Sequence, residues 1–86
     1  MLSKCKILEV KIVRKSVLVD VYCYETKKVL TLSYDFDNFT EKEIYFLYVI
    51  VGREYPTYLI FDSKLDEKDI KQNTLEVVKH FIKFNR

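Results

Sequence analysis

The sequence predicts an α+β domain in which an antiparallel sheet comes first and helices follow. Three observations lead to this class. Apolar and polar residues alternate with a period of two over residues 6–34, as in strands with one buried face. A capping-box pattern follows near residue 40, and an apolar stripe with helical spacing runs through residues 70–84. The length of 86 residues fits one domain, so we expect residues 1–86 to form a single unit.

The alternation changes parity twice, and this predicts a three-stranded antiparallel meander. Apolar side chains lie at even, then odd, then even positions, in residues 8–12, 17–23 and 30–34. Two-residue loops at 15–16 and 26–27 would place Val10 opposite Val21, and Val21 opposite Leu32. One face of the meander is then apolar throughout.

Residues 41–51 are predicted to form a short helix. Thr40 and Glu43 have capping-box spacing, and Phe39 and Ile44 occupy the two positions of a hydrophobic staple. The segment is mostly β-branched or aromatic, a composition that also suits a buried strand. The alternative fold is therefore a five-stranded antiparallel meander with one C-terminal helix. We favour the helix because the local start signals agree.

A fourth strand and a C-terminal helix packed on the sheet complete the predicted fold. The strand is expected at residues 58–61, and Ser63 with Asp66 is the expected helix start. The stripe that should pack on the sheet consists of Ile70, Thr74, Val77, Val78, Phe81 and Phe84. Gln72 and Asn73 interrupt this stripe, so a kink or break there is the alternative to a continuous helix.

Residue patterns that carry catalysis or bind cofactors are absent from the sequence. A single Gly excludes the phosphate-binding and dinucleotide-binding loops, which need several glycines for close backbone approach. His80 is the only histidine, and without a Cys-x-x-Cys pair it cannot complete a zinc site. We therefore expect a protein that is not an enzyme, with no catalytic residue, no metal and no cofactor.

Cys5 and Cys23 are predicted to be free thiols on opposite faces of the sheet. Cys23 belongs to the apolar odd-numbered set of its strand and faces Leu8 in the core, whereas Cys5 takes an outer position. Opposite faces cannot bring two Cβ atoms within the ~4 Å that a disulfide needs.

The outer face of the meander is the main candidate for a binding surface. Residues 1–34 carry seven Lys or Arg against three acids, a net charge of +4. We expect this face to carry Lys11, Lys15, Tyr22 and Tyr24, with Lys27 and Lys28 at its edge, and Lys11 to pair with Asp20. Basic side chains beside exposed tyrosines can hold single-stranded nucleic acid, which is the alternative function.

Burial against another protein explains such a face more simply. Seven Tyr and six Phe are more aromatic residues than a core of this size hides. We therefore expect a small interaction or regulatory protein, a homodimer that binds a protein partner. The candidate partner-binding residues are Lys11, Tyr22, Tyr24, Tyr45 and Tyr48.

The composition also suggests a setting. The chain contains no alanine, which is typical of AT-rich coding and suggests an accessory protein of a virus or mobile element. The longest apolar run, residues 44–51, is too short to span a bilayer, and no signal-peptide pattern is present. We expect no membrane contact and a cytoplasmic location, in the host cytoplasm if the protein is viral.

Overall fold

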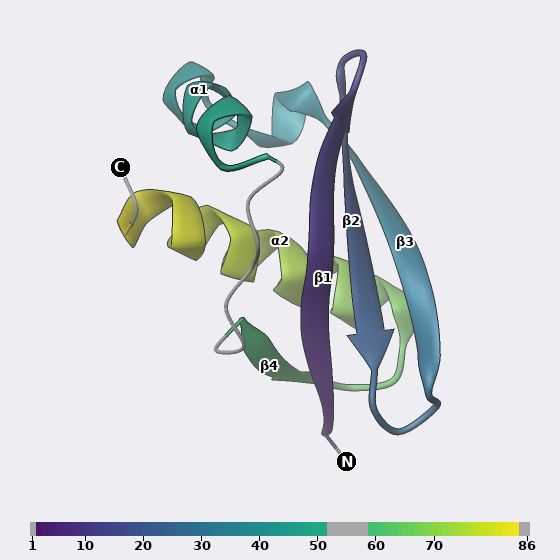
Figure 1. Ribbon diagram of the computed structural model, residues 1–86. Helices are drawn as coiled ribbons and strands as arrows, with labels where there is room; N and C mark the ends of the chain where they lie inside the picture. Colours follow the sequence, from purple (N-terminus) through teal and green to yellow (C-terminus); the bar gives the residue numbers. More distant parts are fainter. Residues whose placement is uncertain (1, 52–58, 85–86) are drawn as a thin grey trace.

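The computed structural model describes residues 2–51 and 59–84, which form four antiparallel strands and two helices. The elements are β1 (Ser3–Val13), β2 (Ser16–Cys23), β3 (Lys28–Asp35), a 3-10 turn (Phe36–Asn38), α1 (Glu41–Ile50), β4 (Ile60–Ser63) and α2 (Glu67–Phe84). The sheet order is β3-β2-β1-β4, and α2 packs on one face of the sheet (Figure 1). The predicted α+β class is confirmed. The five-stranded alternative is wrong, because α1 is a helix.

The first hairpin has its loop at residues 14–15, one residue earlier than predicted. Arg14 adopts a φ of 57°, the left-handed backbone that tight primed turns require. Val10 therefore faces Val19, and the predicted partner Val21 is wrong by two residues. A shift of two residues keeps every side chain on its face, so the buried face of β2 is as predicted.

The second hairpin has a four-residue loop at 24–27 rather than a two-residue loop. Lys27 has a φ of 56°, and its backbone N–H donates to the Cys23 carbonyl at 2.8 Å. Val21 faces Leu30, again two residues from the predicted partner. The faces of β3 are unchanged by this shift for the same reason.

A β-bulge in β1 exchanges the two faces of this strand. The register with β2 shifts by one residue between Ile7 and Glu9, so that two residues of β1 oppose one of β2. N-terminal to the bulge the odd-numbered side chains are buried, and C-terminal to it the even-numbered ones are. Leu8, predicted to be buried opposite Cys23, is instead 43% exposed.

The bulge also corrects the prediction for the two cysteines. Cys5 and Cys23 face each other on the same side of the sheet, with their sulfur atoms 4.0 Å apart. The predicted outer position of Cys5 is wrong, because the bulge reverses the faces at Cys5 and leaves β2 unchanged. Both residues are buried and both thiols are free, and the core position of Cys23 is confirmed.

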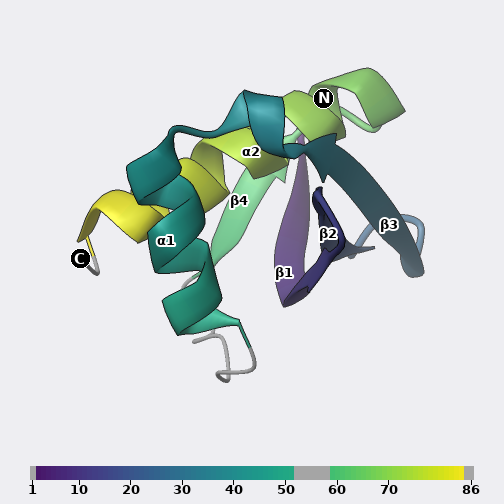
Figure 2. The ribbon, with the colours of Figure 1, turned by 90° about the horizontal axis from the view of Figure 1, so that it is seen from above.

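The capping box of α1 is confirmed. The Thr40 hydroxyl accepts a hydrogen bond from the Glu43 backbone N–H at 3.2 Å, and the Glu43 carboxylate accepts one from the Thr40 N–H at 2.8 Å. Leu47 and Ile50 are the buried residues of this helix. Figure 2 shows α1 beside α2, and Lys79 of α2 forms an ion pair with Glu43 at 3.6 Å.

The fourth strand pairs with the first half of β1, from Ser3 opposite Ser63 to Lys6 opposite Ile60. It ends two residues later than predicted, and its predicted start at residue 58 lies outside the described residues. Ser63, which was predicted to start the C-terminal helix, is therefore the last residue of β4. Its hydroxyl accepts a hydrogen bond from the Asn73 amide at 2.9 Å, which ties β4 to α2.

The long helix α2 starts at Glu67, and the carboxylate of the preceding residue, Asp66, accepts a hydrogen bond from the Lys68 backbone N–H at 3.2 Å. It continues through Gln72 and Asn73, so the alternative of a break there is wrong. Its buried residues are Ile70, Thr74, Val78 and Ile82, whereas Phe84 is exposed. Neither α2 nor α1 is both long and apolar enough to cross a membrane.

Candidate interaction surface

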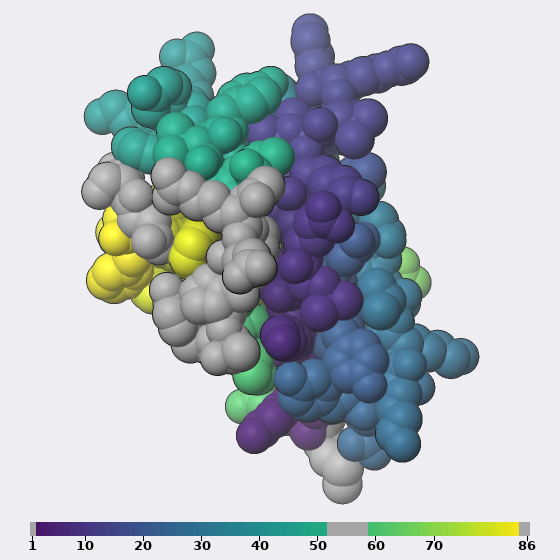
Figure 3. All heavy atoms as spheres, in the orientation of Figure 1, coloured from purple at the N-terminus to yellow at the C-terminus, as the bar shows by residue number. Residues whose placement is uncertain are grey.

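The sheet has an inner face, which packs against α2, and an outer face on the opposite side. Neither helix covers the outer face, which Figure 3 views directly. Its side chains alternate along each strand with the buried ones. They are Lys4, Lys6, Leu8, Glu9, Lys11 and Val13 of β1, Leu18, Asp20 and Tyr22 of β2, Val29, Thr31 and Ser33 of β3, Ile60 and Asp62 of β4, and Tyr24 just after β2.

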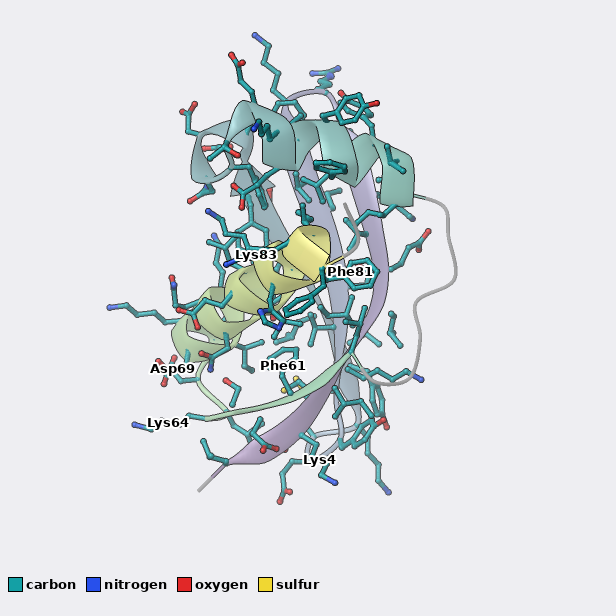
Figure 4. All side chains as sticks on the ribbon, turned by 90° about the vertical axis from the view of Figure 1, so that its left-hand side faces the viewer. Lys4, Phe61, Lys64, Asp69, Phe81 and Lys83 are labelled. Carbon is teal, nitrogen blue, oxygen red and sulfur yellow. The ribbon has the colours of Figure 1, made fainter. Side chains whose placement is uncertain are left out.

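Two tyrosines and two lysines come together at the end of this face nearest the β2–β3 loop. The rings of Tyr22 and Tyr24 lie 5.2 Å apart at an angle of 60°. Tyr22 faces Lys6 across the strand pair, and the Tyr24 backbone N–H donates to the Lys4 carbonyl at 3.1 Å. Figure 4 shows Lys4 pointing away from α2. The basic residues beside the tyrosines are therefore Lys4 and Lys6.

Both tyrosines were among the predicted residues, whereas Lys4 and Lys6 were not. If the even-numbered buried set of residues 8–12 is extended backwards, both lysines fall on the inner face. The signal that could have found them is local, because Cys5 and Ile7 form a short odd-numbered apolar set of their own. Reading that set as a strand with its own parity would have indicated the bulge.

The other predicted basic residues are spread along the sheet. Lys11 faces Leu18, four positions along β2 from Tyr22, or roughly 13 Å at the usual rise of a strand. Lys15 lies in the loop of the first hairpin, at the opposite end of β2 from the tyrosines. Lys27 lies at the tyrosine end, in the loop. Lys28 starts β3 opposite Cys23, so its side chain belongs to the inner face and its predicted place at the edge of the outer face is wrong.

The predicted ion pair between Lys11 and Asp20 is wrong. Lys11 instead contacts the Glu9 carboxylate at 3.5 Å, because both side chains extend from the same face of β1 two residues apart. Asp20 accepts a hydrogen bond from the Thr31 hydroxyl at 2.8 Å. The middle of the outer face is therefore polar, with the acids Glu9 and Asp20 directly opposite each other and the base Lys11 beside Glu9.

The two remaining predicted residues, Tyr45 and Tyr48, lie on α1. Their side chains are 67% and 59% exposed, and neighbouring Val49 is exposed as well. They form an aromatic patch on the helix, separate from the tyrosine end of the sheet, which lies at the other end of the molecule (Figure 1). The structure thus divides the predicted partner-binding residues between two surfaces.

Burial keeps the ionisable groups of the inner face in their protonated forms. Burial, and secondly the adjacent Cys23, raises the pKa of Cys5 to about 12, so its thiol stays protonated at neutral pH. Burial also raises the pKa of Tyr34, whose hydroxyl donates to the Lys71 carbonyl at 2.6 Å. Within residues 2–51 and 59–84, no three His, Cys, Asp or Glu residues gather into a set that could hold a metal ion.

An apolar groove of about 640 Å³ lies between β4 and the C-terminal half of α2. His80 is exposed here and its ring packs 4.5 Å from that of Phe84. Phe61 points from β4 toward the helix (Figure 4). Leu59, which lines this groove, is the first described residue after Val51.

Comparisons with known proteins give no guide to function. No protein-family model, no curated protein and no solved structure matches this chain.

Proposed function

We propose that this protein is a small non-enzymatic interaction protein that binds a protein partner through the outer face of its sheet and associates with itself as a homodimer. The observation that carries the proposal is that a face covered by neither helix bears large apolar side chains. Five of them are between 39% and 52% exposed, namely Leu8, Val13, Tyr24, Val29 and Ile60. An uncovered face of an antiparallel sheet is ordinarily polar, and apolar patches on it mark interaction sites.

The charges of the outer face favour protein over other macromolecules. Lysines alternate there with carboxylates, with Lys11 beside Glu9 and Lys4 opposite Asp62 across β1 and β4. A surface of mixed sign suits a protein partner with complementary charges, whereas a phosphate backbone favours one sign. Tyrosine is also enriched at the energetic centres of protein interfaces.

The alternative function, binding of single-stranded nucleic acid, is favoured by one specific feature. The tilted ring pair of Tyr22 and Tyr24 lies beside Lys4 and Lys6, which is a stacking platform next to positive charge. Lys27, in the loop at this end, would extend the positive charge, whereas Lys28 lies on the inner face and Lys11 and Lys15 lie too far along the sheet to join it. We also propose a cytoplasmic accessory role in a virus or mobile element, on composition alone.

Affinity capture with matched variants tests the protein-binding proposal. The double variant Leu8→Ser, Tyr24→Ser removes two apolar side chains from the outer face. Leu65→Ser removes one of similar exposure from the segment before α2. The proposal predicts that proteins retained from the native cell extract by the unmodified chain are retained by Leu65→Ser and lost from the double variant. Equal retention by all three proteins would contradict it.

Fluorescence anisotropy with labelled single-stranded DNA and RNA tests the alternative. Binding through Lys4, Lys6 and the two tyrosines should weaken steeply as salt increases, because phosphate contacts release counterions. Tyr22→Ser should reduce the affinity further at constant salt. If no anisotropy change appears at low salt, nucleic-acid binding is rejected.

A further inference from the structure

The sheet has one edge strand that is long and unprotected. β3 is eight residues long, has β2 on one side and pairs with none of the described segments on the other (Figure 1). Its sequence contains no proline, and its register with β2 is free of bulges. Natural proteins usually block such an edge with a short strand, a proline, a bulge or an inward charge. β3 has none of these devices between Val29 and Tyr34.

The hydrogen-bond pattern shows which backbone groups of β3 face outward. The Tyr24 N–H donates to Lys4, so even-numbered positions of β2 point toward β1 and odd-numbered positions point toward β3. The partners of these odd-numbered positions in β3 are even-numbered, with Val21 opposite Leu30. The odd-numbered residues of β3 therefore turn their N–H and C=O groups to the free edge.

We propose that a second copy of this chain pairs with the free edge of β3, antiparallel and with Thr31 opposite Thr31, so that two four-stranded sheets become one. This proposal rests on the proposed self-association and names its interface. A two-fold axis perpendicular to the sheet keeps inner faces together and outer faces together. It therefore allows only registers in which odd-numbered residues meet odd-numbered residues.

Charge and polarity select the register among those that symmetry allows. With Thr31 on the axis, Val29 meets Ser33 on the outer face, Leu30 meets Leu32 on the inner face, and Lys27 of each copy meets Asp35 of the other. A shift of two residues in one direction brings Asp35 opposite Val29, where its charge has no partner. A shift in the other direction brings Asp35 opposite Glu25, which repels it. Only the central register pairs the charges at both ends.

The pairing would be made mainly by the backbone. The pairs of Val29 with Ser33, Thr31 with Thr31, and Ser33 with Val29 would exchange about six N–H to C=O hydrogen bonds. Leu30 is only half-buried in one chain, and a neighbouring strand would cover more of it. The mode is β-strand addition, in which main-chain bonds supply affinity and side chains supply register.

Thr31→Pro is the sharpest test, because it removes one outward N–H and leaves the hydrogen bonds between β3 and β2 in place. Thr31→Val is the matched control. It keeps the N–H, and it loses the same hydrogen bond to Asp20 that the proline variant loses. By light scattering across a concentration series, the unmodified chain and Thr31→Val should have twice the chain mass of 10.4 kDa. Thr31→Pro should have the single-chain mass.

A second pair of variants covers the case in which Thr31→Pro does not fold. Thr31→Lys and Thr31→Glu each place like charges on the axis and should each be monomeric. An equimolar mixture should form a heterodimer of twice the chain mass, because opposite charges then meet. This rescue is specific to the register with Thr31 on the axis.

The outcomes separate failure of the interface from failure of self-association. A monomeric unmodified chain at all concentrations would overturn both the homodimer and the β3 pairing. A dimer that persists in Thr31→Pro and in Thr31→Lys would overturn the β3 pairing alone and place self-association on another surface. Capture of a protein partner by the outer face is a separate measurement that neither outcome changes.

Discussion

The two faces of the sheet are built from the same strands, and they differ in what they contribute. Along β2, Val17, Val19 and Val21 have no solvent-exposed surface on the inner face. Leu18 and Tyr22, which alternate with them on the outer face, are only partly buried. The burial of apolar surface against α2 stabilises the fold, whereas the apolar groups of the outer face contribute little to it. The apolar side chains of the outer face are therefore available for binding.

A large difference in stability is expected between two valines of β1 that face opposite ways. Val10 is buried on the inner face of β1 and Val13 is exposed on the outer face. Val10→Ala should lower the free energy of unfolding by about 2–3 kcal/mol, because it removes buried methyl groups and leaves a cavity. Val13→Ala should change it by less than about 0.5 kcal/mol. Urea unfolding of both variants measures these losses, and equal losses of unfolding free energy would contradict the difference between the two faces.

Alkaline pH should destabilise the protein through the inner face. The thiol of Cys5 has an ordinary pKa of 9.0, which burial and the adjacent Cys23 raise to about 12 in the folded protein. As pH rises the unfolded thiol therefore loses its proton first. Stability is full below about pH 9 and falls between about pH 9 and 12. Unfolding free energies measured across this range should fall, and the fall should be smaller in Cys5→Val.

A control for this titration comes from a second buried group of the inner face, Tyr34 of β3. If Cys5→Val shows the same pH dependence as the unmodified chain, Cys5 is not the group responsible. Tyr34, whose pKa is raised by burial as well, would then be the first residue to replace, by phenylalanine.

The smallest expected effect is on the outer face. Lys11 and Glu9 form an ion pair at 3.5 Å, but both side chains are more than half exposed. Exposed ion pairs contribute little because water and salt screen them, so Lys11→Ala should cost no more than about 0.5 kcal/mol. Unfolding measured at low and high salt checks this. A loss comparable to that of Val10→Ala would mean that the outer face is not the exposed face.

Much of the fold follows from local sequence signals. The parity of β2 and β3 predicts their faces correctly, since a register error of two residues leaves every side chain on its side. The capping box of Thr40 and Glu43 predicts the start of α1 despite the strand-like composition that follows. These features depend on residues close together in the chain, so they can be predicted from a single amino-acid sequence.

The loops and the bulge could not be predicted in the same way. Arg14 and Lys27 adopt left-handed backbone angles that glycine or asparagine usually marks, so neither loop length has a sequence signal. The bulge at Leu8 adds one residue to β1, and only the short odd-numbered set of Cys5 and Ile7 indicates it. Its consequence for the candidate surface is large, because it brings two lysines to the outer face beside the tyrosines.

The bulge in β1 decides which side chains of this strand belong to which face, and the composition of the outer face depends on it. Ile7 and Leu8 are adjacent, and Ile7 is 1% exposed whereas Leu8 is 43% exposed. The most direct test is the free energy of unfolding of Ile7→Ala and Leu8→Ala, measured side by side. We expect a loss of about 2–5 kcal/mol for Ile7→Ala and less than about 1 kcal/mol for Leu8→Ala. A larger loss for Leu8→Ala would mean that β1 alternates without a break, and the outer face described here would then be wrong.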